Sequence, residues 1–537
     1  MNQSTLKTFA QNARRKLREL VGNRLDYVIN TDTAELRQQA IQVNELRTAI
    51  KTEGRDPLIE RVAYTWFNRL AALRFMDTNG YHPFGARVLT PATANETLPE
   101  LLQQARAGAL DPELADLPIS KSPDRPLSTA ISDLLAGRIG VNHPEAHVYR
   151  FLLVGVCNYY HRLMPFMFEK IGDATELLLP EDLLTEHSIV HDFRTELVDD
   201  DCRDVEVIGW LYQYYISERK DAVMARNAAV PREDIPAVTQ LFTPHWIVRY
   251  LVENSLGRLW LLNRPQSRLR DKMPYYIEGE AETDFLKIAK PEEIRLLDPA
   301  EGSGHMLTYA FDLLYAIYEE EGYDAPEIPS LILKHNLYGV DICDRAAALA
   351  AFALTMKARS KDNRFFRRVV QPNVISLQDA RFEDDELGRY FNAIGVQPST
   401  LHPEFLKLLN QFEDAKNFGS LIQPCLGDSE IVNLKSAIAA RVSAQTQLEL
   451  TLYQTHAKIL QSLDQAEYLC QRYHVVVTNP PYMGNKGLNA QLKICIEEQF
   501  SDFKTDLFAV FVVRSMSLAY SHGYLAWIST RKSSTKS

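Results

Sequence analysis

Residues 297–306 read LDPAEGSGHM, and this stretch decides the fold class of the chain. An apolar run precedes it and a helical pattern follows it, which is typical of a strand–turn–helix unit. Gly302 and Gly304 permit a tight turn and let a ligand approach the backbone, where a β-carbon would clash. Asp298 stands at the carboxyl end of the expected strand, where open α/β sheets bind ligands. The stretch therefore predicts a ligand site at the turn.

The chemistry of this loop favours an amino acid-like ligand. A carboxylate such as that of Asp298 repels a pyrophosphate but attracts an ammonium group. The loop therefore suits the methionyl part of S-adenosylmethionine, with Ala300 and Ser303 beside the glycines. Ser303 is also expected to cap the helix that follows. The alternative is an ordinary corner between a strand and a helix.

Short β-rich runs alternate with helical ones after residue 236, which predicts an α/β fold with a parallel sheet. The expected strands are Ile294–Asp298, Asn336–Asp341, Asn373–Leu377, His474–Asn479 and Gly523–Ser529. The expected helices are about Gly304–Glu320, Arg345–Lys357, Asn489–Phe500 and Leu507–Ser521. Residues 381–472 are far too many for a usual crossover, and their heptad-like part predicts an inserted helical subdomain.

The first 235 residues are expected to form an all-α domain. Asp56 is a plausible N-cap, Pro57 fits the first helical position, and Asn79–Gly80 supplies a stop signal. Residues 218–236 are charged and contain two prolines, so a linker is expected there. The predicted domains are therefore 1–235 and 236–537.

The second decisive stretch is VVVTNPPY at residues 475–482. Its apolar run predicts a buried strand, which Pro480 and Pro481 end and stiffen. An amine on an aromatic ring is a poor nucleophile, because its lone pair is delocalised into the ring. If the Asn479 side-chain oxygen and the Pro480 carbonyl each accept one of its N–H bonds, that lone pair is freed. Tyr482 can stack on the base, and positioning of this kind can contribute roughly 7–11 kcal/mol. The alternative is a strand that ends in a polyproline turn.

Two further acidic residues follow expected strands. Asp341 and Ile342 end the second strand, where a carboxylate can accept hydrogen bonds from ribose hydroxyls. Asp341 could equally cap the helix that begins near Arg345. Asp379 follows the third strand and could accept a hydrogen bond from an adenine amino group.

The two motifs together, Asp298–Gly304 and Asn479–Tyr482, resemble those of the amino-methylating DNA methyltransferases. In that group a Phe-Thr-Pro element commonly precedes the glycine loop and touches the methionine end of the cofactor. The corresponding residues here are Phe242, Thr243 and Pro244. This order of motifs resembles the gamma-type N6-adenine enzymes.

The likeness is greatest to the PglX family, the adenine methyltransferases of BREX phage-defence systems, and spans about Leu6 to Ile528. It also rests on residues 62–81 and on Asp506–Phe508. It implies a Rossmann-like methyltransferase sheet, S-adenosylmethionine as cofactor with Phe508 among its contacts, and a flipped adenine in double-stranded DNA as substrate. Lys486 is the candidate phosphate contact, and other phage-defence proteins are expected partners.

The chain also departs from that family, whose members are longer and continue into a target-recognition region. Here the fifth strand is followed only by the polar, basic residues 530–537. We therefore expect a sheet that is incomplete at its C-terminal hairpin, no target-recognition domain, and a truncated product or a separate C-terminal half. An exposed strand edge would reduce solubility.

Composition narrows the possibilities further. The 537 residues carry 59 Lys+Arg and 70 Asp+Glu, and this net charge of −11 argues against tight DNA binding by this chain alone. The six cysteines have no C-x-x-C spacing, so we expect no metal. No signal peptide or membrane-spanning run of about 18 apolar residues is visible, so a cytoplasmic location is expected.

Two other functions stay open at this point. Asn-Pro-Pro-Tyr also occurs in protein-glutamine and some RNA guanine methyltransferases, whose planar amide or amine poses the same lone-pair problem. The chain could also be a truncated cofactor-binding subunit that transfers nothing on its own.

Overall fold

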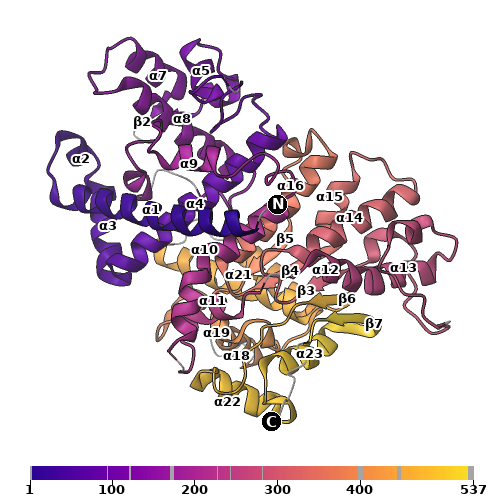
Figure 1. Ribbon diagram of the computed structural model, residues 1–537. Coiled ribbons are helices and arrows are strands. Elements are labelled where there is room, and N and C mark those ends of the chain that lie inside the picture. The colour runs from indigo at the N-terminus through magenta and orange to yellow at the C-terminus, as the bar shows by residue number, and fades with distance from the viewer. Residues whose placement is uncertain are drawn as a thin grey trace. The chain divides into compact units, whose positions relative to one another are not determined.

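The computed structural model describes residues 3–93, 95–119, 122–169, 174–226, 228–241, 243–280, 282–396, 403–443 and 449–529 (Figure 1). The chain forms two compact units. Unit 1 comprises Met1–Glu218 and Thr355–Gln371, and unit 2 comprises Arg219–Leu354 and Pro372–Ser537. The boundary expected near residue 235 thus lies within unit 2, and both α10 and α16 cross from one unit into the other.

Unit 1 is mainly helical, and its longest well-buried helix is α4 (Arg55–Asn79). Its other elements are α1 (Gln3–Asn30), α2 (Ala34–Gln38), α3 (Ala40–Glu53), α5 (Glu100–Arg106), α6 (Pro112–Ala115), β1 (Pro118–Ile119), β2 (Ser122–Pro126), α7 (Leu127–Leu135), α8 (Pro144–His161), α9 (Ile189–Thr195) and the first part of α10 (Glu206–Met224). The antiparallel pair of β1 and β2 contradicts the all-α expectation. This pair is too short to show as an alternating pattern in the sequence.

Two local predictions in this region need correction. The N-cap of α4 is Gly54 and not Asp56. The N-cap residue has a φ of +92°, which glycine adopts readily and aspartate rarely does. Asp56 instead lies in the first turn, where its charge suits the helix dipole. The expected linker begins too early, since α10 continues to Met224. Charged residues such as Glu218 are good helix formers, so charge alone did not mark a break. The predicted stop at Gly80 is confirmed by its left-handed conformation.

Unit 2 contains a five-stranded parallel sheet in the order β5-β4-β3-β6-β7. The strands are β3 (Leu296–Asp298), β4 (Leu337–Asp341), β5 (Asn373–Ser376), β6 (Tyr473–Thr478) and β7 (Ala519–Trp527). All five predicted strands are confirmed, although their ends differ by a few residues. The largest difference is at Ala519–Ser521, which was expected to be helical. Ala519 is extended and pairs with Tyr473, so the strand begins directly after the helix.

Helices cover both faces of this sheet. Those outside the β5–β6 interval are α11 (Ile235–Thr239), α12 (His245–Val252), α13 (Arg258–Asn263), α14 (His305–Glu320), α15 (Ile328–His335), α16 (Asp344–Lys361), α22 (Ala490–Gln499) and α23 (Leu507–Leu518). Along β4, Gly339 faces Leu307 of α14, while Tyr338 and Val340 face the opposite layer. This alternation places α14 and the β5–β6 helices on opposite faces.

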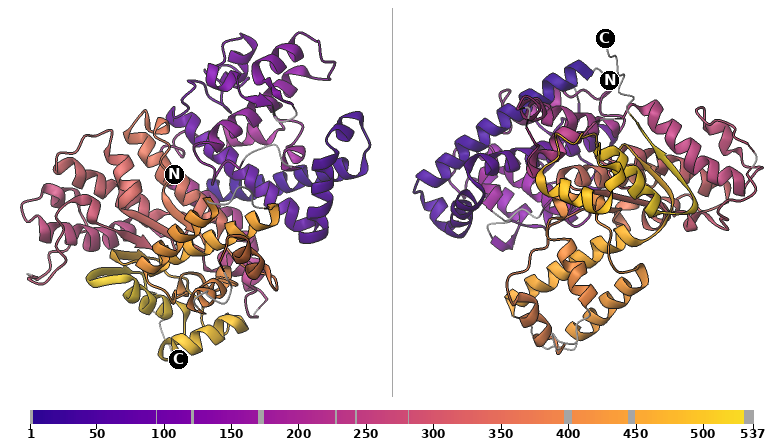
Figure 2. Two further views of the ribbon diagram at one scale, coloured as in Figure 1. Left: turned by 180° about the vertical axis from the view of Figure 1, so that it is seen from behind. Right: turned by 90° about the horizontal axis from the view of Figure 1, so that it is seen from below.

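The described residues between β5 and β6 form helices joined by turns and loops, and none of them forms a strand. Its helices are α17 (Glu386–Ala393), α18 (Pro403–Gln411), α19 (Ala415–Phe418), α20 (Asp428–Ser443) and α21 (Leu450–Cys470). In the right-hand view of Figure 2 the orange helices of this interval form a lobe. Apolar side chains such as Leu408, Ile459 and Leu463 pack with Val340 and Val476 of the sheet into one buried cluster. That these helices are an insertion stays a prediction.

Within the described ranges, none of the helices combines the length and the apolar character that crossing a bilayer requires.

Candidate active site

Parallel strands end at one edge of the sheet, and this edge gathers most of the predicted site residues. Asp298 ends β3, Asp341 ends β4, and Asn479 follows β6 directly. The strands β3 and β4 pair side by side, as do β3 and β6, so the three loops that leave them are neighbours. The order of the sheet therefore brings together two motifs that lie about 180 residues apart in the sequence.

The two glycines of the loop after β3, Gly302 and Gly304, are required for different reasons. Gly302 has a φ of +55°, and the space beside its α-carbon is open, with only Gln240 Nε2 3.8 Å from where a β-carbon would lie. Gly304 has a φ of +83°, and a β-carbon there would lie 2.9 Å from Cβ of Ala350. Gly304 therefore lets α14 start close against α16, whereas Gly302 leaves room for a ligand.

Ser303 does not cap α14, contrary to the prediction. The N-cap of α14 is Gly304, so no side chain caps this helix. The Ser303 hydroxyl instead lies 3.1 Å from Nδ1 of His305. The left-handed conformation of Gly304 begins the helix one residue later than the prediction assumed, so the serine points elsewhere.

Two aspartates, the buried Asp298 and the half-buried Asp341, hold the loop in shape. Asp298 is only 2% exposed and accepts a hydrogen bond from the Ala300 N–H at 3.1 Å. Asp341 accepts from the Gly302 N–H at 3.0 Å and from the Cys343 N–H at 2.7 Å. Burial raises the pKa of Asp298 to about 7 and that of Asp341 to about 6. Asp341 thus supports the glycine loop and also the turn into α16, which is the alternative that the sequence left open.

Glu301 is a third acidic group at this site and was not among the residues predicted from the sequence. It is 4% exposed, and neither carboxyl oxygen has a hydrogen-bond partner within the described part of the chain. Its Oε2 lies 1.7 Å from where a β-carbon on Gly339 would stand, so only glycine fits below it. Burial raises the pKa of Glu301 well above its usual value, with further contributions from Asp341 and Asp298. The sequence feature that could have identified this residue is the position of a glutamate directly before Gly302 in the glycine loop.

Asn479 is held so that its side-chain oxygen stays free. Its Nδ2 donates to the Leu241 carbonyl and to the Thr243 hydroxyl, both at 3.1 Å. The Leu241 carbonyl can only accept, so this contact fixes which end of the amide is the nitrogen. Oδ1 is buried and has no partner in the described structure. The Asn479 amide therefore offers an acceptor that awaits a donor.

The Phe-Thr-Pro element reaches this site through its threonine. Thr243 is 5% exposed and contacts Asn479, and Pro244 is the N-cap of α12. Phe242 lies outside the described residues. Two positions before it, Gln240 was marked by no sequence motif, and its Oε1 is also buried without a partner in the described chain.

Beyond Asn479, the residues Pro480 and Pro481 form the turn, and Tyr482 follows them. The Tyr482 hydroxyl donates to the Ile528 carbonyl at 2.7 Å, and its ring centre lies 6.1 Å from that of Phe508 at an interplanar angle of 35°. Burial raises the pKa of Tyr482 to about 12. The structure thus brings Phe508 to this turn, with the tyrosine ring fixed by its hydroxyl.

Asp379, Lys486 and two apolar residues complete the predicted set. The Asp379 carboxylate is already bonded to Arg232 and to the Lys416 N–H, the latter at 3.0 Å. Ala300 and Ile342 pack beside one apolar cluster, and Lys486 is exposed in the loop after Tyr482. An adenine contact by Asp379 would therefore require it to give up partners that the sequence did not reveal.

The residues at the sheet edge fit S-adenosylmethionine. The open side of Gly302 admits a ligand, the unpartnered amide oxygens require donors, and the two aspartates of the loop favour a cation such as an ammonium or a sulfonium. No group of three or more His, Cys, Asp or Glu side chains within the described ranges is arranged to hold a metal ion.

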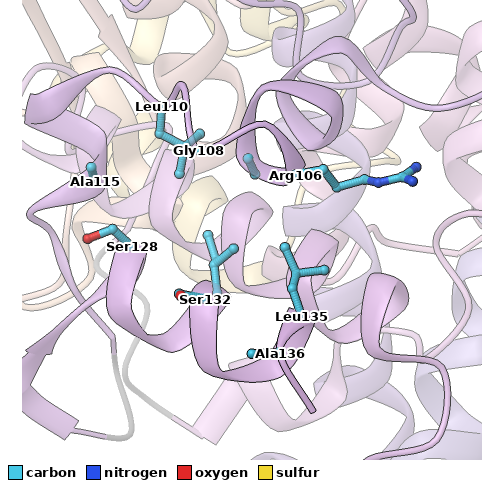
Figure 3. A pocket seen from close by; sticks show the side chains of 10 residues that line it. Arg106, Gly108, Leu110, Ala115, Ser128, Ser132, Leu135 and Ala136 are labelled. Atoms are coloured by element: carbon cyan, nitrogen blue, oxygen red, sulfur yellow. The ribbon is translucent and has the colours of Figure 1, made fainter. Parts of the chain in front are cut away.

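A different cavity, of about 420 Å³, lies in unit 1 between α5 and α7 (Figure 3). Small and apolar side chains line it together with Ser128 and Ser132, and the Arg106 side chain extends away from it. None of the predicted site residues lines this cavity.

Comparisons with known proteins agree with the motifs. Residues 335–537 match the family of the Eco57I restriction-modification methylase. The chain is 41% identical over 508 residues to the adenine-specific methyltransferase BrxX of Escherichia coli O9:H4 (strain HS), covering 89% of this chain and 40% of that protein. It is 31% identical over 579 residues to the adenine-specific methyltransferase PglX of Lacticaseibacillus casei (strain Zhang), covering 98% and 46%. The chain thus spans less than half the length of both relatives.

Two solved structures also align with the chain. The DrdV–DNA complex is 12% identical, with a TM-score of 0.37 over 98% of this chain and 35% of that one. The type IIL enzyme MmeI in complex with DNA is 11% identical, with a TM-score of 0.38 over 96% and 49%. These scores are too low to support an argument. The sequence matches, however, confirm the family resemblance: the chain is homologous to part of the adenine-specific methyltransferases BrxX and PglX, and its C-terminal part matches the Eco57I restriction-modification methylase family.

Proposed function

We propose that this chain carries the catalytic portion of a site-specific DNA adenine-N6 methyltransferase of a BREX-type phage-defence system. The observation that carries the proposal is the geometry of Asn479, whose nitrogen is tied down and whose buried oxygen is free. The exocyclic amine of a flipped adenine is a donor that suits this acceptor. Both curated relatives are described as adenine-specific methyltransferases, which favours adenine over a protein amide or an RNA base.

The chain would act mainly by orienting the target amine. Asn479 Oδ1 and the Pro480 carbonyl each accept one N–H bond, which turns the nitrogen lone pair out of the ring plane. Thr243 and the Leu241 carbonyl keep the amide in this orientation. Tyr482, fixed through Ile528, provides a ring surface for the base. When bound, S-adenosylmethionine supplies an electrophilic methyl group on a sulfonium sulfur.

The cofactor would lie along the sheet edge. Asp298 and the backbone around Gly302 face its amino acid part, with Thr243 and Pro244 beside them. Asp341 would accept hydrogen bonds from the ribose hydroxyls, with Ile342 beside it as a further cofactor contact. Phe508 and Asp379 remain predictions, and Asp379 is the weaker of the two because Arg232 already pairs with it.

This chain alone is expected to bind DNA only weakly. The net charge of −11 opposes contact with phosphates. We therefore propose that a further part of the protein or a partner of the defence system contributes most of the affinity for DNA.

The test is to express the chain in a bacterial host that lacks adenine methylases and to quantify N6-methyladenine in digested DNA by mass spectrometry. We expect a signal above that of the empty vector, and none from an Asn479→Ala variant expressed at the same level. If the purified chain binds S-adenosylmethionine but its DNA stays unmethylated even with the partner proteins of its system, the proposal is wrong. Methylated glutamine in a host protein would favour the protein-methylating alternative instead.

A further inference from the structure

Gln240 stands out among the residues that no motif assigned. Its backbone is fixed on both sides, because its N–H donates to the Pro236 carbonyl at 3.2 Å and its carbonyl accepts from Lys220 Nζ at 3.0 Å. The next carbonyl along the chain, that of Leu241, holds Asn479. The side chain of Gln240 therefore starts from a well-defined point beside the catalytic turn.

The amide of this side chain is incompletely satisfied. Its Oε1 is buried and has no hydrogen-bond partner in the described structure. Its Nε2 lies on the open side of Gly302, at 3.8 Å from where a β-carbon would be. A buried acceptor without a donor is unfavourable, and native proteins rarely keep one unless a ligand or water supplies the missing group.

We propose that Gln240 binds the amino acid end of the cofactor, with Oε1 accepting a hydrogen bond from its ammonium group. This inference rests on the proposed function, since it takes S-adenosylmethionine as the ligand. The ammonium group has three N–H donors, and the buried Asp298 at the same loop favours a cation there. The target adenine is the less suitable donor, because Asn479 Oδ1 is already placed to receive its amine. Gln240 Nε2 is then available to the carboxylate of the same amino acid group.

A double-mutant cycle between protein and ligand tests this contact. The protein change is Gln240→Met, which keeps the length of the side chain but removes the amide. The ligand change is from S-adenosylhomocysteine to its analogue without the amino group. Affinities are measured by titration calorimetry on the full 537-residue chain, so no turnover is needed. The exposed Gln499→Met variant is the matched control.

We expect removal of the ligand's amino group to weaken binding to the wild-type chain about tenfold, as for one hydrogen bond to a charged group. In Gln240→Met the same removal should change affinity less than threefold, and Gln499→Met should behave as wild type. The affinity for 5′-methylthioadenosine, which lacks the amino acid part, should be equal in all variants. Gln240→Glu retains an acceptor and should keep the sensitivity to the amino group.

Equal loss of affinity in wild type and Gln240→Met on removal of the amino group would overturn the proposal. So would a parallel loss of 5′-methylthioadenosine binding, because that would show a merely structural role. If Gln240→Met does not fold, the comparison of wild type with Gln240→Glu decides: loss of the sensitivity in Gln240→Glu would then refute the contact. Methylation of adenine by wild type together with an additive cycle rejects this inference alone, whereas a coupled cycle without DNA methylation rejects the proposed function alone.

Discussion

Asp77 in unit 1 and Asn479 in unit 2 both have buried side-chain oxygens, but only in Asp77 do these oxygens have hydrogen-bond donors. Asp77 is 1% exposed and accepts from the N–H groups of Val88, Leu89 and Thr90 at 2.7–2.9 Å. The Thr90 hydroxyl and His82 Nε2 complete its shell. Asn479, by contrast, uses its nitrogen and leaves its buried oxygen without a donor.

This difference separates a structural cluster from a functional one. A fully satisfied buried network stabilises one arrangement of the backbone, since every partner would be left unpaired by any other arrangement. A buried acceptor without a donor is unfavourable for the isolated fold and becomes favourable only when a ligand arrives. Asn479, Gln240 and Glu301 all carry such atoms, and all three lie near the glycine loop or the turn after β6.

The largest expected effect comes from breaking the satisfied cluster. Asp77→Ala should lower the free energy of unfolding of the chain by about 3–5 kcal/mol, because several buried donors lose their acceptor at once. Denaturant unfolding followed by circular dichroism measures this. The exposed Asp116→Ala in the same unit should change stability by less than about 0.5 kcal/mol. A loss below about 1 kcal/mol for Asp77→Ala would show that the network is not a main determinant of the fold.

Removing the Asn479 amide should have the opposite effect, with a large loss of methyl-transfer rate and only a small loss of stability. Asn479→Ala should reduce methyl transfer about 100- to 1000-fold, as expected when a preorganised polar contact to the reacting group is removed. Its stability should fall by only about 1 kcal/mol, and its affinity for S-adenosylmethionine should stay within twofold of wild type. Single-turnover methylation and calorimetry measure the two quantities, with the exposed Asn485→Ala as control. An equal loss in rate and in cofactor affinity would contradict the assignment of Asn479 to the base.

A contrast between local and long-range contacts explains which features of the site could be predicted from the sequence. Gly302 and the Asn479–Tyr482 turn were identified from sequence because their chemistry depends on a few adjacent residues. The pairing of Asp379 with Arg232, and the contact of Gln240 with Lys220, join segments that are distant in the sequence, so no local pattern marks them. The parallel direction of the strands followed from the alternation of strands and helices, whereas their order in the sheet is set by long-range pairing and was not predicted. The short strand pair of unit 1 was not predicted either, because it is too brief to have a period.

A smaller effect should appear in the pH dependence of cofactor binding. Asp298 has a pKa raised to about 7 by burial, so it is mostly neutral at pH 6 and ionised at pH 8. Only the ionised form attracts a cationic ligand, so affinity for S-adenosylmethionine should rise about tenfold from pH 6 to pH 8. Asp298→Asn should remove most of this rise, and the exposed Asp324→Asn should not.

Stability should respond in the other direction. Because the folded-state pKa of Asp298 lies above the unfolded value, its contribution to stability is greatest in acid and is lost as pH rises through about 7. Asp298→Asn should therefore be less sensitive to pH than wild type between pH 5 and 8 in thermal unfolding. If cofactor affinity rose with falling pH instead, Asp298 and Asp341 could not be the groups that favour the cation.

The smallest expected effect concerns Lys486, the candidate contact to DNA. It is exposed in a loop that backbone hydrogen bonds hold beside the catalytic turn, from the Gly487 N–H to the Gly484 carbonyl at 2.8 Å and from the Val230 N–H to the Gly487 carbonyl at 2.9 Å. A single phosphate contact changes the slope of log affinity against log salt by about 1. Lys486→Ala should therefore reduce that slope by about 1 and weaken DNA binding only a few-fold at moderate salt, with cofactor affinity unchanged. Fluorescence anisotropy with labelled duplex DNA over a range of salt concentrations measures the slope, and the exposed Lys334→Ala is the control. An unchanged slope would mean that this lysine is only solvated, and that a chain with a net charge of −11 must rely on other groups to hold DNA at the site.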